Sequence, residues 1–207
     1  MLNKDYRAIK EKIIDWLKQK KNESGTRGAV VGLSGGIDSA VTAVLCKNAF
    51  PENTLGVIMP CHSDSEDEQD ALLLTEVFSI QHEIIELKKT YETMLASLPD
   101  EGNKIARGNI KSRLRMIILY FFANINNYLV VGTGNRSELK LGYFTKYGDG
   151  GVDIEPLGNL STQDAVTAHS FVLKNRRHNA GFFLYSAIIP VYRYLAAKSI
   201  YFFPYLI

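Results

Sequence analysis

One short segment of the chain has the residue types that hold a phosphate group, Ser34-Gly35-Gly36-Ile37-Asp38-Ser39. It follows an apolar run, Gly28–Leu33, that is typical of a buried strand, and it precedes a helix-like stretch, Ala40–Phe50. A helix start presents unpaired N–H groups and the positive end of its dipole. The two glycines leave room for a ligand, the two serines add hydroxyl donors, and Asp38 could hold a magnesium ion that bridges phosphate oxygens.

A structural alternative for this segment is a tight strand-to-helix turn in which Ser and Asp act as caps. The common phosphate-binding loop is excluded, because it needs a Lys followed by Ser or Thr after its second Gly. The complete string S-G-G-x-D-S favours a phosphate site instead. It resembles the pyrophosphate loop of the N-type ATP pyrophosphatases, which split ATP between the α- and β-phosphates and adenylate a substrate.

A second group of motifs runs from Gly108 to Asp153. In Gly108–Met116, Lys111 and Arg115 lie four apart on a helix while Arg113 points elsewhere. Another strand end, Gly-rich turn and helix start follow in Val131–Glu138. The next loop, residues 142–153, is rich in glycine, aromatic and charged residues, a composition better suited to gripping a ligand than to packing a core.

Together these motifs resemble the NAD synthetases over about residues 28–160. The resemblance rests on GLSGGIDS, GNIKSRLRM, VGTGNRSELKLGYFTKYGDGGVDIEP and the Met59-Pro60 strand end. It implies an adenine nucleotide alpha hydrolase-like, Rossmann-like fold. It implies an ATP site formed by Gly32, Leu33, Ser34, Gly35, Gly36, Ile37, Asp38, Ser39 and Thr133. It implies magnesium ligands Asp38 and Glu138, and a deamido-NAD site formed by Arg113, Lys146 and Asp153.

The implied reaction is a ligase reaction. The nicotinate carboxylate of deamido-NAD attacks the α-phosphate of ATP, pyrophosphate leaves into the glycine loop, and ammonia displaces AMP to give NAD. Positioning and charge neutralisation would supply most of the catalysis. The resemblance names no residue as a covalent catalyst. Ammonia is the expected nitrogen source, because neither cysteine lies in a recognisable nucleophile motif.

Length and composition predict one globular α/β domain. The 207 residues carry a net charge of +2, so no basic bias toward nucleic acid is present. The two cysteines, Cys46 and Cys61, indicate a reducing compartment and buried thiols rather than a disulfide framework. Charged residues interrupt the N-terminal stretch, so we expect no signal peptide and a cytoplasmic protein.

Alternating apolar runs predict a mostly parallel, twisted sheet with helices on both faces. The expected strands are residues 28–33, 54–59, 82–87 and 128–132, and the expected helices include residues 6–17, 40–50, 65–78 and 107–125. Ligands in such sheets bind at the carboxyl ends of the strands. The loops after Leu33, Met59 and Gly132 should therefore converge on one crevice.

The acidic cluster at residues 64–70 has a structural interpretation that needs no metal. Ser65 and Glu68 fit a capping box, and acids suit a helix start. The same kind of alternative applies to the proposed metal ligands: Asp38 would cap its helix, and Glu138 would be a first-turn acid.

Residues 161–207 depart from the family. The family has a Lys in an L-x-K-T-like segment, and this Lys is missing because the chain reads Leu160-Ser161-Thr162-Gln163. Residues 161–207 also contain only one acidic residue, Asp164, but five Lys and Arg residues. We therefore divide the chain into a domain of residues 1–160 and an atypical tail of residues 161–207, which a frameshift, divergence or truncation would explain. Its longest uncharged run, residues 179–192, is shorter than the about 20 residues of a spanning helix, so no membrane anchor is expected.

Three further expectations concern function and assembly. Another amide-forming or tRNA-modifying ATP pyrophosphatase is one alternative, and a non-catalytic, truncated nucleotide-binding remnant is the other. The missing Lys favours the remnant and puts the activity of this chain in question. Apolar residues cover more than one face of the expected helix at residues 107–125, which predicts a homodimer; they are Ile117, Ile118, Tyr120, Phe121 and Phe122.

Overall fold

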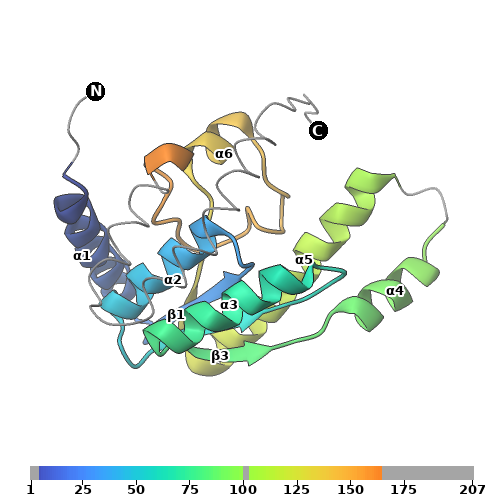
Figure 1. The fold of residues 1–207 in the computed structure, drawn as a ribbon, viewed down its shortest axis with the longest axis horizontal. Helices are drawn as coiled ribbons and strands as arrows, with labels where there is room; N and C mark the ends of the chain where they lie inside the picture. The colour runs from blue at the N-terminus through green and yellow to red at the C-terminus, as the bar shows by residue number, and fades with distance from the viewer. Residues whose placement is uncertain (1–4, 100–102, 165–207) are drawn as a thin grey trace.

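Four parallel strands form the centre of the molecule in a computed structural model that describes residues 5–99 and 103–164 (Figure 1). Their order is β3-β2-β1-β4. The strands are β1 (Gly28–Leu33), β2 (Thr54–Ile58), β3 (Gln81–Ile84) and β4 (Tyr128–Val131). The helices are α1 (Tyr6–Ser24), α2 (Ile37–Ala49), α3 (Ser65–Phe78), α4 (Lys88–Ala96), α5 (Lys104–Asn126) and α6 (Arg136–Leu141). The predicted parallel α/β architecture is confirmed.

The register of the two central pairings brings three strand ends together. Leu33 of β1 lies opposite Ile58 of β2, and Val31 lies opposite Val131 of β4. A single bridge between Val131 and Ile154 then adds the segment after the 142–151 loop to the outer edge of β4. The chain therefore leaves β1, β2 and β4 at the same edge of the sheet.

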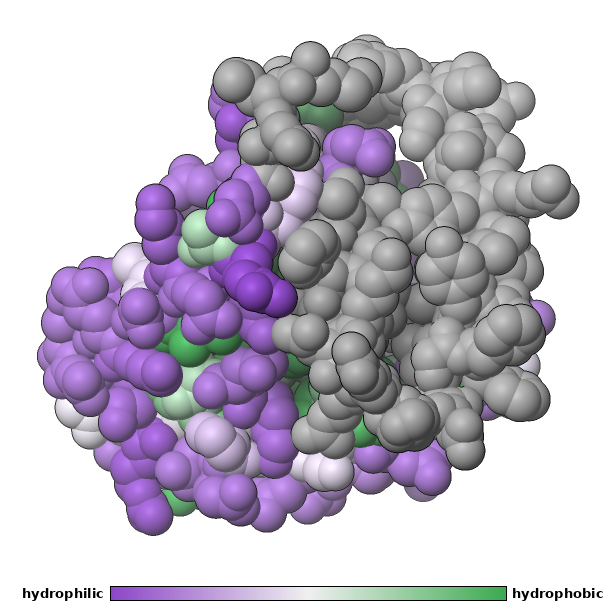
Figure 2. Space-filling view, turned by 60° about the vertical axis from the view of Figure 1, so that its left-hand side comes forward, coloured by the Kyte–Doolittle hydropathy of each residue, from purple (hydrophilic) through white to green (hydrophobic). Residues whose placement is uncertain are grey.

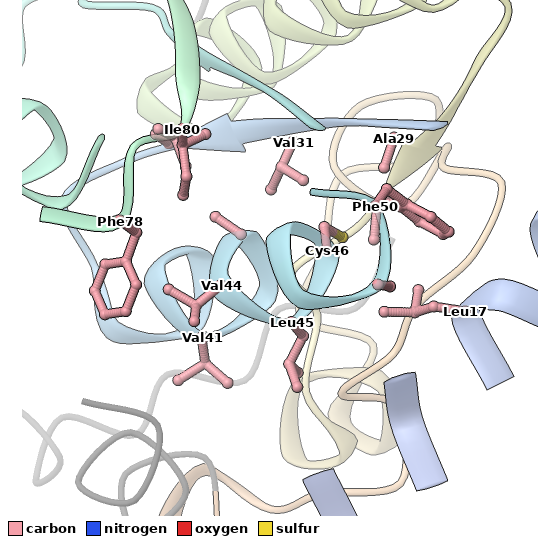
Figure 3. Close-up of a cluster of buried hydrophobic side chains, with 14 of the residues drawn as sticks. Leu17, Ala29, Val31, Val41, Val44, Leu45, Cys46, Phe50, Phe78 and Ile80 are labelled. Carbon is pink, nitrogen blue, oxygen red and sulfur yellow. The ribbon is translucent and has the colours of Figure 1, made fainter. Parts of the chain in front are cut away.

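Each face of the sheet carries its own hydrophobic core. Side chains alternate along a strand, so Val31 of β1 points to one face while Val30 points to the other. The first face packs against α1, α2 and α3, and Figure 3 shows α2 residues such as Val44 and Cys46 beside Val31. The second face packs against α4 and α5 through residues such as Tyr91 and Leu119. Helices thus cover both faces, as the sequence predicts.

Several element bounds differ from those expected. Helix α2 begins at Ile37 rather than Ala40, so Asp38 lies inside its first turn. Strand β3 ends at Ile84 and is exposed throughout. Helix α4 was not predicted, and Tyr91 is the residue that it buries. The predicted thiol burial is confirmed for Cys46 and Cys61.

The described surface is mostly polar on the face that Figure 2 shows, where hydrophobic residues appear in small, separate patches. Within residues 5–99 and 103–164, no helix is both long and apolar enough to cross a membrane. The expected tail lies outside the described residues from position 165 onward. Its first residues do contact the domain, because the Tyr6 hydroxyl donates to Asp164 Oδ1 at 3.2 Å.

Candidate active site

A cleft of about 430 Å³ opens at the carboxyl ends of β1, β2 and β4. Its walls include Leu33 at the end of β1, Ser34 after it, Met59 after β2 and Thr133 after β4. Helix α5 closes one side with Arg115 and Met116. The expected convergence of the three loops on one crevice is confirmed.

The Ser34–Ser39 loop takes a conformation that requires glycine at its centre. Gly35 has a φ of +79°, and a Cβ there would lie 2.4 Å from the backbone oxygen of Asp67. The Ser39 hydroxyl stays inside the loop, since it donates to the Gly36 carbonyl at 2.8 Å and accepts from Ser34. No side chain caps α2. Within the loop, Ser34 lines the cleft, and the uncapped start of α2 follows at Ile37.

Asp38 does not cap its own helix, so the capping alternative for this residue is wrong. Its Oδ2 instead accepts a hydrogen bond from Asn135 Nδ2 at 3.1 Å, across 97 positions of sequence. Its Oδ1 is buried and has no hydrogen-bond partner among the described residues. Burial raises the pKa of Asp38 to about 6, the hydrogen bond from Asn135 opposes that shift, and the nearby charge of Glu138 adds to it.

Glu138 has a local structural role, as the alternative interpretation expected. Its Oε2 accepts from the Asn135 backbone N–H at 3.0 Å, while Asn135 Oδ1 accepts from the Glu138 N–H. These two bonds form the capping box of α6. Because Asn135 is hydrogen-bonded to both Asp38 and Glu138, the structure brings the two predicted carboxylates to the same residue.

This carboxylate pair fits a magnesium ion. Mg²⁺ is bound in proteins by one or two carboxylates together with waters and substrate phosphates. The buried, unpartnered Oδ1 of Asp38 is an oxygen that such an ion would satisfy. Residues 5–99 and 103–164 contain no larger cluster of His, Cys, Asp or Glu suited to a metal, so the pair would depend on the nucleotide for further ligands.

The turn after β4 contributes two further features. Thr133 lines the cleft beside Gly132, where a Cβ would come within 2.6 Å of Val152. Glu155 was missed from the sequence. It lies against Gly134, and burial raises its pKa, with the charges of Asp149 and Glu138 adding to the shift. Glu155 could have been predicted from the sequence, because it lies two residues after Asp153 and residues two apart in an extended segment point to the same side.

Helix α5 presents its basic residues to two sides, as expected. Lys111 donates to the Cys61 carbonyl at 3.0 Å, and Arg115 donates to the Met59 carbonyl at 3.2 Å. Both therefore hold the end of β2 against α5. Arg113 faces elsewhere and donates to the Lys146 carbonyl at 3.1 Å, which joins two of the residues assigned to deamido-NAD.

The loop at residues 142–151 is tied to α5. Asp149 Oδ1 accepts from the Ser112 hydroxyl at 2.6 Å and from the Thr145 N–H at 3.0 Å. Three aromatic side chains of the loop remain exposed, which suits contact with a ligand; they are Tyr143, Phe144 and Tyr147. The Asp153 carboxylate does not share the Arg113–Lys146 contact; it accepts hydrogen bonds from Tyr120 of α5 and Val130 of β4 instead.

The acidic start of α3 corrects one prediction. Asp64, not Ser65, is the N-cap, and it makes no side-chain cap bond, so the capping box of Ser65 and Glu68 is wrong. The reason is that the helix already includes Ser65 at its first position. Asp67 and Glu68 instead line the cleft, and burial raises the pKa of Asp67, with the charges of Asp64 and Glu66 adding to the shift.

The position of the family's missing Lys, Thr162, contacts Asn135, the residue bonded to Asp38 and Glu138. Thr162 is exposed, and its hydroxyl donates to Asn135 Oδ1 at 3.4 Å. Ser161 and Asp164 hold this turn, since Asp164 Oδ2 accepts from the Ser161 hydroxyl at 2.7 Å. The departure from the family therefore includes a residue that contacts Asn135, which is bonded to both carboxylates.

Comparisons with known proteins agree with these observations. Residues 9–170 match the model of the NAD synthase family. The chain is 52% identical over 155 residues to an NH(3)-dependent NAD(+) synthetase of Carboxydothermus hydrogenoformans, a match that covers 73% of this chain and 64% of that protein. It is 46% identical over 171 residues to the protein of the same name from Syntrophomonas wolfei, a match that covers 80% of this chain and 69% of that protein.

Solved structures show the same fold. An NH3-dependent NAD synthetase from Campylobacter jejuni has a TM-score of 0.78 at 36% identity and covers 82% of this chain and 74% of its own. An NMN synthetase from Francisella tularensis has a TM-score of 0.79 at 36% identity, and the match covers 86% of this chain and 77% of that protein. The parallel sheet is the Rossmann-like, adenine nucleotide alpha hydrolase-like fold of these neighbours. From its matched residues, its fold and its loop motifs, the chain belongs to the NAD synthase family.

Proposed function

We propose that this chain is an ammonia-dependent NAD synthetase, which converts deamido-NAD, ATP and ammonia to NAD, AMP and pyrophosphate. The observation that carries the proposal is the Ser34–Ser39 loop, which meets the cleft at Ser34 and whose Asp38 is joined to Glu138 through Asn135. The names of the relatives support it.

ATP would bind along the edge of the sheet. The proposed contacts are Gly32, Leu33, Ser34, Gly35, Gly36, Ile37, Asp38, Ser39 and Thr133. Gly32, Leu33, Ser34 and Thr133 line the cleft, which supports this placement. The uncapped start of α2 would face the phosphates with its N–H groups and dipole, an arrangement suited to a departing pyrophosphate.

Asp38 and Glu138 would hold Mg²⁺. The ion would supply charge neutralisation on the phosphate oxygens when bound. Both carboxylates are hydrogen-bonded to Asn135, which supports a site preorganised by the protein.

Deamido-NAD would bind at Arg113, Lys146 and Asp153. The Arg113–Lys146 contact and the exposed aromatic residues of the 142–151 loop support a binding surface for a large anionic substrate there. Its nicotinate carboxylate oxygen would form a bond to the α-phosphorus of ATP as the bond to pyrophosphate breaks. Ammonia would then attack the acyl carbon, and AMP would leave with the bonding electron pair.

A cytoplasmic homodimer is the proposed form of the protein. Helix α5 exposes Ile117, Phe121 and Ile125, which are spaced four apart and so form one apolar stripe. An exposed stripe of this kind is typical of a protein interface.

The test is a product assay on the purified chain. With ATP, Mg²⁺, deamido-NAD and ammonium, NAD and AMP should form in equal amounts. Glutamine treated to remove ammonia should not replace ammonium. ATP–pyrophosphate exchange that depends on deamido-NAD would locate the adenylation step. Absence of exchange, together with intact folding, would favour a nucleotide-binding remnant.

A second candidate is amidation of the mononucleotide to give NMN. The fold of the Francisella tularensis NMN synthetase matches this chain as well as that of the NAD synthetase from Campylobacter jejuni. The same assay with nicotinate mononucleotide in place of deamido-NAD discriminates the two by their kcat/KM values.

A further inference from the structure

Asn135 is the N-cap of α6, and it is bonded to both predicted magnesium ligands. It is only 1% exposed, and its side-chain and backbone groups bond to two carboxylates that are far apart in sequence. Its Nδ2 donates to Asp38 at 3.1 Å, and its backbone N–H donates to Glu138 at 3.0 Å. No assigned role in the proposed reaction includes Asn135.

The side-chain oxygen of Asn135 is also held by hydrogen bonds. Its Oδ1 accepts from the backbone N–H groups of Ser137 and Glu138 at 2.9 and 3.2 Å, and from the Thr162 hydroxyl at 3.4 Å. These bonds determine which atom of the amide faces Asp38, because the oxygen is already used by α6. The amide nitrogen is thereby directed at the carboxylate.

A helix cap alone does not need this arrangement. Asn, Asp and Ser are about equally good N-caps, and the capping function uses the oxygen only. The amide nitrogen adds a link from α6 to the first turn of α2, and without it Asp38 would have neither oxygen hydrogen-bonded by the described residues. The link therefore serves the carboxylate rather than the helix.

We propose that Asn135 is a positioning residue that holds Asp38 and Glu138 together so that their carboxylates bind one divalent cation with the nucleotide. The inference rests on the proposed function for the nucleotide. Residues that hydrogen-bond to metal ligands orient them, and their loss typically weakens metal binding or activity by about 10- to 100-fold.

The test variant is Asn135→Ser, which keeps a capping oxygen and removes the amide donor. Asn103→Ser is the matched control, because Asn103 caps α5 by accepting from the Ala106 N–H at 2.9 Å, whereas the bonds to Asp38 and Glu138 belong to Asn135. The Mg²⁺ concentration for half-maximal pyrophosphate exchange should rise about 10- to 100-fold in Asn135→Ser, with the rate at saturating Mg²⁺ largely restored. Asn103→Ser should match the parent.

Metal binding is measured separately from turnover. Calorimetric titration with Mn²⁺ in the presence of α,β-methylene-ATP should show the same loss of affinity. In an Asp38→Asn background, Asn135→Ser should have little further effect, because the residue it positions is already changed. An unchanged Mg²⁺ requirement, or a rate that falls equally at every Mg²⁺ concentration, would overturn the positioning role. Asn135→Thr replaces the serine variant if that one does not fold.

The two proposals fail in different ways. If the parent chain binds no Mn²⁺ with the ATP analogue, the proposed function fails and the metal role of Asn135 is overturned with it. The link itself is then decided by urea unfolding of Asn135→Ser, Asp38→Ala and the double variant. Midpoint shifts that are not additive support the link, and additive shifts contradict it.

Discussion

Asp153 and Tyr120 join the loop after residue 151 to the long helix, with the Tyr120 hydroxyl donating to Asp153 Oδ1 at 2.9 Å. The other oxygen, Oδ2, accepts from the Val130 N–H of β4 at 2.8 Å. A carboxylate that the family resemblance assigns to deamido-NAD is therefore already hydrogen-bonded to α5 and to the sheet. Burial and this bond raise the pKa of Tyr120 to about 12, so the hydroxyl remains a donor at neutral pH.

Tyr120→Phe tests how much the Tyr120–Asp153 hydrogen bond contributes to the stability of the fold. The change removes one charge-assisted hydrogen bond and should lower the free energy of unfolding by about 1–2 kcal/mol. Urea unfolding monitored by circular dichroism measures it. Tyr143→Phe is the control, because Tyr143 is 76% exposed. Equal midpoints for the parent and both variants would mean that the Tyr120 contact contributes nothing to stability.

Asp38→Asn and Glu138→Gln test the proposed metal ligands. Each variant keeps an oxygen for its bond to Asn135, so folding should stay nearly intact. Magnesium-dependent ATP–pyrophosphate exchange should fall by about a hundredfold or more, because charge on the transferring phosphoryl group is no longer neutralised. Asp15→Asn removes an exposed charge from α1 and should exchange like the parent. Lost stability with an unchanged rate per folded molecule would instead assign both residues a structural role.

The pKa of Asp38 predicts how stability depends on pH in metal-free buffer. Its folded pKa of about 6 lies above the ordinary pKa of 3.8, so the folded state binds the proton more tightly than the unfolded state. This contribution to stability is fully present below pH 3.8 and is lost as the pH rises through about 6. The loss amounts to at most about 3 kcal/mol.

Asp38→Asn lacks this titration. Its stability relative to the parent should therefore increase between pH 4 and pH 7, measured by urea unfolding at each pH. A constant difference across that range would show that Asp38 titrates normally in the folded protein. The Asp15→Asn variant serves again as the control for general charge effects.

Thr162→Lys tests whether the departure from the family costs affinity for ATP. Thr162 is exposed and its hydroxyl reaches Asn135, so a longer side chain fits there and places its charge near the carboxylates and the nucleotide phosphates. The KM for ATP should fall about tenfold, equivalent to roughly 1.4 kcal/mol. Thr162→Met matches the length without the charge and should leave KM unchanged. An equal effect of both changes would show that the charge is not responsible.

Phe121→Asp tests the proposed homodimer. Phe121 is 57% exposed in the middle of the α5 stripe, and a charge there opposes burial of that stripe against a second copy. Light scattering at micromolar concentration should give a dimer mass for the parent and a monomer mass for the variant. Ile105→Asp, at the start of the same helix and 54% exposed, should remain a dimer. A folded parent that is monomeric would exclude the assembly.

Sequence alone determined the framework of this protein. The continuous apolar run Gly28–Leu33 coincides with β1, because a strand buried on both faces needs apolar side chains at every position. The Ser34–Ser39 string identified the loop, because only glycine allows the backbone at Gly35. Convergence of the three loops followed from the rule that parallel strands end at one edge.

Tertiary structure decided which polar groups meet. Ser65 and Glu68 have the spacing of a capping box and form none, whereas Asn135 and Glu138 have the same spacing and do form one. The hydrogen-bond partner of Asp38 could not be predicted from sequence spacing either, because Asn135 lies 97 positions away. Spacing records only what neighbouring residues can do locally. Which donor reaches a buried carboxylate depends on how distant helices pack onto the same sheet edge, because there the bond replaces the water that burial removes.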